Sequence, residues 1–233
     1  ASLYQRLVQL FGKLSRFRDQ GVEMCQVGEC LFRLKDAKGA ETWFQKARKL
    51  GADLGCMELE CRATLGLGEI EFYIHNRMHE AEELLRHALS VLDFVEGENA
   101  PPETVVVRHL TEVLKTDRTE EAGPFVERLR ELATRKTDGA DPSVLSDMVV
   151  ALELAVNFQV IMGHSAQAAK DMQALEDVYK RMPEGAQKAD LEHMVQHARG
   201  STERLMKAAG MHGGMPMRRK RRRFRLLRKP AGG

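Results

Sequence analysis

Four cysteines form the first group of side chains whose type and spacing suggest chemistry. Cys25 with Cys30, and Cys56 with Cys61, make two C-x4-C pairs, and thiolates are strong zinc ligands. Within a helix, a step of five residues turns the chain through about 500°, so the two thiols of a pair point about 140° apart. Structural zinc sites use tighter spacings on turns, of about two to four residues. We therefore interpret the four as free cysteines buried between packed helices, and we expect no metal and no cofactor.

Histidines and glycines offer three further candidates for chemistry. His193 and His197 share a helix face, but no glutamate follows the first histidine as a metalloprotease motif requires, so we expect unliganded surface histidines. The segment 163–167 has one glycine and no preceding strand, unlike a nucleophile elbow. The segment 66–68 continues with Glu69, which excludes a dinucleotide or phosphate loop. The sequence therefore predicts a protein that is not an enzyme.

The strongest local signal is a run of cations close to the end of the chain. Its nine members are Arg218, Arg219, Lys220, Arg221, Arg222, Arg223, Arg225, Arg228 and Lys229. Without them, 27 basic residues face 34 acidic ones, which leaves residues 1 to 217 with a formal charge of −7. Cations at this density repel one another and cannot bury enough apolar surface to fold alone. The sequence therefore predicts a disordered basic tail over residues 210 to 233.

Three functions remain open for this tail, and the fourth alternative is a solvated end without a role. The run RRKRRR is similar to a nuclear import signal. A contact with nucleic acid is the second alternative, and it predicts an affinity that falls steeply with salt, because each neutralised phosphate releases counterions. In the third, Phe224, Leu226 and Leu227 among the arginines dock on an anionic membrane or an acidic protein surface.

The helices that position these side chains are predicted from a repeated triad of residues. Each triad begins with alanine, has a large apolar residue four positions later, and ends three positions after that with a small or apolar residue. The triads are Ala40/Phe44/Ala47, Ala81/Leu85/Ala88 and Ala122/Val126/Leu129, each 41 residues apart, and Ala168/Met172/Leu175 after 46. A fixed period of this size predicts stacked helical hairpins. We expect no membrane span, because no run of eighteen apolar residues occurs, and no secretory signal. The expected location is intracellular, either cytoplasmic or nuclear.

Periodicity and turn residues divide the chain into ten expected helices. They cover residues 2–18, 22–34, 39–50, 53–74, 78–95, 101–114, 119–133, 142–161, 166–182 and 184–208. We expect Gly51 to end the helix 39–50, and Pro101 and Pro102 to lie in the first turn of the helix 101–114. Thr119, Asp141 and Ser165 are the expected caps of the three helices that follow. Gly200 should break or bend the last helix. Because Leu7, Phe11 and Leu14 keep the triad spacing, residues 1–20 are predicted to be the second helix of a truncated upstream repeat. Repeats then fill residues 21–182, and a capping helix covers 183–209.

One unit of this array resembles the tetratricopeptide repeat (TPR) family. In a 34-residue unit that starts at Gly21, the matching residues are Gly28 at position 8, Leu31 at 11, Ala40 at 20, Phe44 at 24 and Ala47 at 27. The later units are longer, about 41 residues, and resemble the extended repeats of kinesin light chains. The resemblance implies an all-α fold, a right-handed superhelical array of antiparallel helix pairs. It also implies a concave surface, lined by the first helix of each pair, that binds a peptide or a partner helix.

The resemblance transfers groove positions onto eleven residues of this chain. They are Cys25, Glu29, Phe32 and Arg33 in the first unit, Glu69, Ile70 and Tyr73 in the second, and Val107, Thr111, Leu114 and Lys115 in the third. Chaperone-binding members of the family clamp a terminal carboxylate with lysine and asparagine at the first two positions, and Cys25 and Glu29 cannot do this. The sequence thus predicts a protein-binding scaffold or adaptor. The alternative is a nucleic-acid-associated protein whose repeats are a rigid spacer for the tail.

Overall fold

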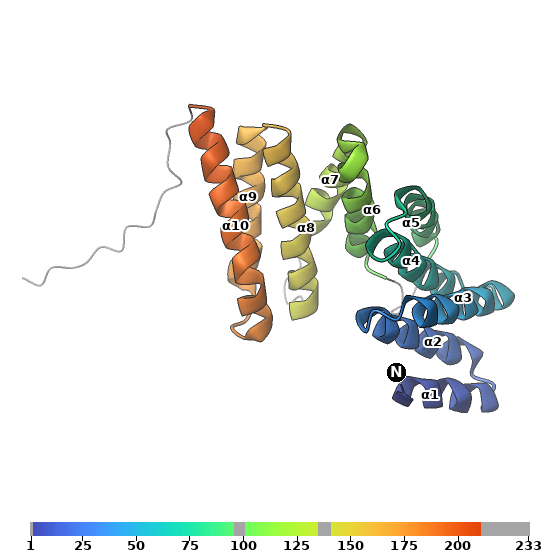
Figure 1. Ribbon diagram of the computed structural model, residues 1–233. Helices are drawn as coiled ribbons and strands as arrows, with labels where there is room; N and C mark the ends of the chain where they lie inside the picture. The colour runs from blue at the N-terminus through green and yellow to red at the C-terminus, as the bar shows by residue number, and fades with distance from the viewer. Residues whose placement is uncertain (1, 96–100, 135–140, 211–233) are drawn as a thin grey trace, which may run out of the picture.

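The computed structural model describes residues 2–95, 101–134 and 141–210, which form a curved row of helices (Figure 1). The helices are α1 (Ser2–Lys13), α2 (Phe17–Arg33), α3 (Ala37–Leu54), α4 (Met57–Tyr73), α5 (Met78–Leu92), α6 (Glu103–Asp117), α7 (Thr119–Thr134), α8 (Pro142–Ile161), α9 (Ser165–Arg181) and α10 (Ala186–Ala208). No strand occurs in these three ranges.

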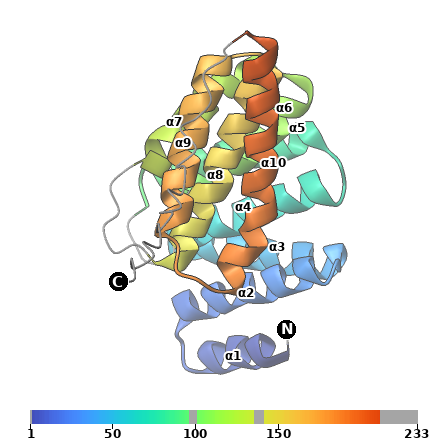
Figure 2. The ribbon, with the colours of Figure 1, turned by 90° about the vertical axis from the view of Figure 1, so that its left-hand side faces the viewer.

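The helices lie in two layers, because each helix packs against the next one along the chain and reverses direction. In the inner layer, α2, α4, α6, α8 and α10 each contact the next member of the layer. In the described chain, the backbones of α3, α5, α7 and α9 in the outer layer do not approach one another as closely as those of the inner layer. The array therefore curves toward the inner layer, and Figure 2 shows α8, α9 and α10 stacked at its far end. The predicted all-α array of antiparallel helix pairs is confirmed.

The repeated triads form the core of the array. All twelve of their side chains, which lie on α3, α5, α7 and α9, have relative exposures of 0 to 1%. On α1, however, the expected triad is wrong in register. Leu14 is 58% exposed, whereas Tyr4, Val8 and Phe11 have the same spacing and face α2, with Val8 only 5% exposed. Leu7 and Leu14 thereby lie on another face of the helix.

Two expected helix ends are wrong, and the turn geometry explains both. α1 ends at Lys13 rather than near residue 18, because Ser15 takes a left-handed conformation with φ 56° and Phe17 already belongs to α2. Gly51 does not end α3, because it lies buried inside the helix, close to the backbone of α4. The helix ends at Gly55 instead, where φ is 63° and the missing side chain avoids strain.

Among the expected caps, only the one at Asp141 is confirmed. Its carboxylate accepts a hydrogen bond from the amide of Ser143 at 2.8 Å, with proline at the first helical position. The hydroxyl of Thr119 instead donates backward to the carbonyl of Lys115. Ser165 is the first residue of α9 rather than its cap. Pro101 and Pro102 precede α6 instead of lying in its first turn. The helix α10 continues unbroken through Gly200.

α8 is long and apolar enough to cross a membrane by length and composition alone, although Asp147 and Glu153 interrupt its apolar sequence, as expected from the absence of a run of eighteen apolar residues. Ten of its twenty residues are buried inside the fold. It contacts α6, α7, α9 and α10, so both of its sides are covered by other helices. Helices that are apolar all round are typical of the interior of a helical array as well as of membranes.

Candidate functional site

Polar contacts join α2 to α4 and α4 to α6 in the inner layer. Arg62 on α4 donates from Nε and from a terminal nitrogen to one oxygen of Glu29 on α2, at 3.0 and 2.8 Å. His109 on α6 lies 2.8 Å from the carboxylate of Glu69 on α4. These pairs fix the spacing of the inner helices, and this spacing sets the width of the concave groove.

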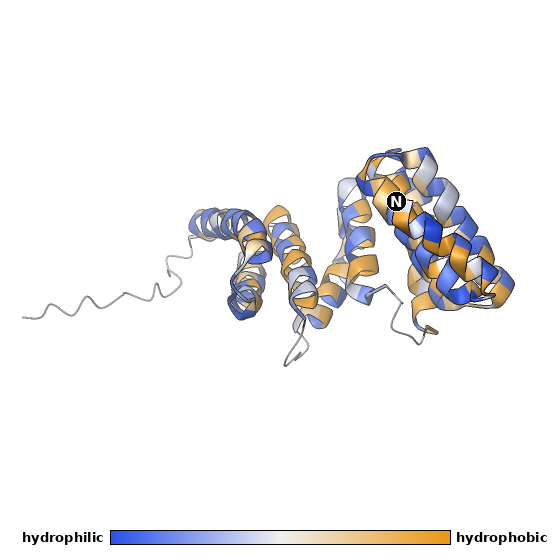
Figure 3. Ribbon diagram, turned by 90° about the horizontal axis from the view of Figure 1, so that it is seen from below, coloured by the Kyte–Doolittle hydropathy of each residue, from blue (hydrophilic) through white to orange (hydrophobic). Residues whose placement is uncertain are grey.

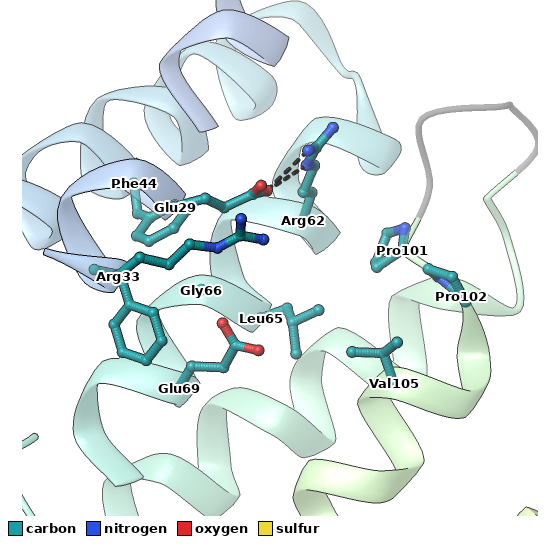
Figure 4. Close-up of a pocket in the computed structure, with 11 residues that line it drawn as sticks. Glu29, Arg33, Phe44, Arg62, Leu65, Gly66, Glu69, Pro101, Pro102 and Val105 are labelled. Carbon is teal, nitrogen blue, oxygen red and sulfur yellow. Dashed lines mark hydrogen bonds and ion pairs between the residues drawn. The ribbon is translucent and has the colours of Figure 1, made fainter. Parts of the chain in front are cut away.

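A pocket opens in this groove between α2, α4 and the start of α6, with a volume of about 420 Å³ (Figure 4). Its lining combines apolar and charged groups. The residues are Glu29, Phe32, Arg33, Phe44, Arg62, Leu65, Gly66, Glu69, Pro101, Pro102 and Val105. Pro101 and Pro102 form the wall opposite α2 in Figure 4. The volume of the pocket lies within the range of ligand sites, and four of its eleven lining residues are charged.

Two glycines on neighbouring inner helices shape the floor of the pocket. Phe44 reaches inward from α3, and its ring lies against Gly28 on α2 and Gly66 on α4. A Cβ atom would come within 2.8 Å of the ring at Gly28 and within 2.4 Å at Gly66. Both positions therefore require glycine for the ring to insert between the two helices.

Arg33 is the cation of the pocket that has no partner. It is exposed, and it makes no hydrogen bond or ion pair with any residue in the described ranges, whereas Arg62 is bound to Glu29. Figure 4 shows its side chain pointing into the pocket between Glu29 and Glu69. A ligand group that accepts hydrogen bonds could reach it without breaking an existing pair.

Beyond the pocket, the groove continues into a polar network around His109. This side chain is 5% exposed, and its Nδ1 lies 3.1 Å from the hydroxyl of Tyr73, which in turn donates to Glu112. Burial lowers the pKa of His109, but the neighbouring carboxylates of Glu112 and Glu69 outweigh burial and hold the pKa above its ordinary value. A protonated imidazole satisfies the carboxylate on one side and the tyrosine oxygen on the other. The network joins α4 to α6.

Of the eleven residues predicted for the groove, four line the pocket: Glu29, Phe32, Arg33 and Glu69. Tyr73 lies in the His109 network, and Lys115 is half-buried farther along α6. The other five are corrected, because Cys25, Ile70, Val107, Thr111 and Leu114 are 0 to 1% exposed and cannot contact a ligand. For α6, the groove positions were assigned to the wrong residues, because this helix has no glycine that would mark position 8 of its unit. Val105 lines the pocket, and Arg108 and Glu112 are partly exposed on α6.

The sequence analysis missed several pocket residues, although one of them, Leu65, could have been found from the repeat register. The Cβ position of Gly68 lies 3.1 Å from Leu85, the counterpart of Phe44, so Gly68 corresponds to Gly28 and occupies position 8 of the second unit. That register places Leu65 at position 5, a groove position. Arg62, Gly66, Pro101, Pro102 and Val105 had no such signal, because their places depend on how α4 and α6 pack.

The cysteines and the tail complete the predicted sites. All four cysteines are free thiols; Cys25 and Cys61 are buried, as expected, while Cys30 and Cys56 are partly exposed. Burial raises the pKa of Cys25 to about 12 and that of Cys61 to about 11. The nine cations between residues 218 and 229 lie outside the described residues.

Comparisons with known proteins support the fold alone. No model of a protein family matches the chain, and no curated protein matches it. Among solved structures, the chain is similar to BtubC (BKLC) from P. vanneervenii, over 99% of this chain and 97% of that chain, with a TM-score of 0.52 and 16% sequence identity. At this identity the likeness establishes a helical repeat fold and no activity.

Proposed function

We propose that the chain is a non-catalytic scaffold of the TPR type, which binds an extended peptide or a helix of another protein in its concave groove. The observation that supports this most directly is the pocket between α2 and α4, where an unpaired arginine lies beside apolar walls. Repeat arrays present extended concave surfaces, and peptide recognition commonly combines apolar pockets with a few charges.

A pull-down with matched variants of the full chain tests this proposal. Arg33→Glu reverses the unpaired charge in the pocket, and Phe32→Ala removes an apolar wall. Arg48→Glu is the control, because Arg48 is equally exposed but lies on α3 in the outer layer. We expect partners retained by the wild type and Arg48→Glu to be lost from both pocket variants, with affinity reduced about tenfold or more. Partners that are retained equally by all four proteins would contradict groove binding.

The basic tail supports a second proposal, in which residues 218–229 contact nucleic acid or an acidic protein, or act as a nuclear import signal. The density of nine cations in twelve residues favours it. Titration of single-stranded RNA and duplex DNA at two salt concentrations, with the full chain and with residues 1–217, measures the tail directly. We expect affinity that depends on the tail and falls steeply with salt. Equal binding by both proteins would rule out the tail as the contact.

A further inference from the structure

One helix of the outer layer differs in charge from the next two helices of that layer. α3 holds four basic residues and two acidic ones, whereas α5 and α7 each hold two more acidic residues than basic ones. With the turn before it, α3 carries five cations, which are Lys35, Lys38, Lys46, Arg48 and Lys49. The outer layer thus places one basic helix beside two acidic ones.

The five cations of α3 and its preceding turn have no carboxylate partner. All five are exposed, and none of their side chains makes a hydrogen bond or ion pair with a described residue. The carboxylate of Asp36 accepts from the amide of Gly39 at 3.0 Å, and that of Glu41 accepts from the side chain of Gln45 at 2.9 Å. In contrast, α2, α4, α5, α6 and α7 each hold at least one arginine bound to a carboxylate.

Three of the lysines form a row on the side of α3 that faces away from the core. At about 100° per residue, Lys38, Lys46 and Lys49 lie within about 80° of one another. The buried residues of α3 lie on the opposite side; they are Ala40, Phe44, Ala47 and Gly51. Hydrophilic and hydrophobic segments alternate along the helices near the N label in Figure 3, as expected for helices that bury one face. From Lys38 to Lys49 the row extends for about 16 Å.

The single tryptophan of the chain lies beside this lysine row. Trp43 is partly exposed, and Nζ of Lys46 lies 4.7 Å from the centre of its ring. This cation–π contact holds the ammonium group next to the ring without neutralising its charge. The intrinsic fluorescence of Trp43 therefore reports on ligands at this surface.

We propose that the lysine row of α3 binds the phosphate backbone of a nucleic acid. Lysines without acidic partners along a helix match a chain of regularly spaced phosphates, and such contacts position a nucleic acid without reading its sequence. Phosphates recur about every 3.4 Å along the axis of a strand, so the row spans several of them. This surface belongs to the array itself and is separate from both the groove and the segment 218–229.

The charges of the outer layer favour a strand of nucleic acid over an anionic membrane. A flat bilayer on this side of the array would also meet α5 and α7, where Glu80, Glu83 and Glu127 are exposed. The lysine row also offers no apolar side chain that could insert among lipids. A narrow strand, in contrast, can follow α3 alone.

Titration of the full chain with single-stranded RNA and with duplex DNA tests the proposal, because Trp43 fluorescence gives the location and anisotropy of labelled nucleic acid gives the affinity. We expect both ligands to change Trp43 fluorescence, with an affinity that falls steeply as salt rises. Lys38→Gln/Lys46→Gln/Lys49→Gln should abolish the Trp43 response. It should also reduce the slope of log affinity against log salt by about 2–3, since each phosphate contact contributes about 0.7–0.9.

A second triple variant controls for net charge. Arg48→Gln/Lys170→Gln/Lys207→Gln removes three exposed cations outside the row and should keep both the Trp43 response and the slope. Arg48 lies about 80° from Lys38 on the other flank of α3, beside Glu41. A full chain whose nine cations between residues 218 and 229 are replaced by glutamine should bind more weakly but keep the Trp43 response.

Several results would overturn the lysine row. Wild-type Trp43 fluorescence that stays unchanged while nucleic acid binds would do so and would leave the basic tail as the contact. A Trp43 response lost on neutralisation of residues 218–229, or a lysine variant with the wild-type slope, would have the same meaning. A stronger Trp43 response to polyglutamate or to phosphatidylserine vesicles than to nucleic acid would assign the row to an acidic protein or to a membrane instead.

Discussion

The buried ion pair between α7 and α9 allows a quantitative test of what holds the outer layer together. Arg130 donates from Nε to one oxygen of Asp171 at 2.6 Å and from a terminal nitrogen to the other at 2.9 Å. Asp171 is 1% exposed, and the amide of Gln167 donates to it at 2.9 Å. The carboxylate therefore has almost no access to water and depends on the arginine for neutralisation.

Arg130→Met keeps most of the side-chain stem and removes the charge, which leaves a buried carboxylate with the glutamine as its remaining donor. We expect a loss of about 3–5 kcal/mol in the free energy of unfolding, the usual effect of breaking a buried pair from one side. The double variant Arg130→Met/Asp171→Leu should recover most of this loss, because well-packed apolar side chains replace buried pairs at little cost. Lys180→Met is the control; its partner Asp177 is 61% exposed, and such pairs contribute about 0–1 kcal/mol.

Urea unfolding followed by circular dichroism at neutral pH measures these differences. The slope of the free energy against urea must be compared among the variants, because a repeat array can unfold in parts. A loss below about 1 kcal/mol for Arg130→Met, or a double variant as unstable as the single one, would refute the assignment of the effect to a desolvated carboxylate. Added salt should weaken the contribution of Lys180 but leave that of Arg130 nearly unchanged, since buried pairs are screened little.

Three further predictions concern the inner layer. Gly66→Ala should cost about 1–3 kcal/mol in thermal unfolding, because its Cβ would lie 2.4 Å from the ring of Phe44; an unchanged melting curve contradicts this packing. The raised pKa of His109 adds stability that is fully present below the unfolded value of 6.5 and is lost as pH rises through the folded pKa. Urea unfolding should therefore show a larger loss for His109→Gln at pH 5.5 than at pH 8.5, and equal losses would contradict the ion pair. Iodoacetamide at pH 8 should modify Cys30 well before Cys25, whose pKa burial raises to about 12, as mass spectrometry can follow; equal rates would show that Cys25 is accessible.

The outer layer was predictable from the sequence because each of its helices buries one face. Ala81, Leu85 and Ala88 sit on that face at helical spacing, and the same holds for the equivalent triads. Inner helices are covered on several sides, so the pattern that distinguishes one face from another is lost. The run 63–68 on α4 is buried at every position, and its sequence therefore offers no stripe from which to read a groove face.

The pocket needed tertiary information for the same reason. Gly66 and Gly68 both suit a close approach between helices, but the first faces Phe44 and the second faces Leu85. Only the packed structure shows which glycine contacts which side chain. Glu29 and Arg33 were found because the first unit keeps the TPR register, in which Gly28 occupies position 8 and makes room for Phe44.

The contacts of the array also relate the proposed groove to the packing of its first helices. In a repeat protein, stability is close to a sum of units and of interfaces between neighbours. The pair between Glu29 and Arg62 joins α2 to α4, and Arg18 adds a second link to Glu58 on α4. α1, in contrast, contacts α2 as its one substantial neighbour in the described chain. Because α2 carries both α1 and one wall of the pocket, a change in how α2 packs against α4 alters the pocket as well as the position of α1.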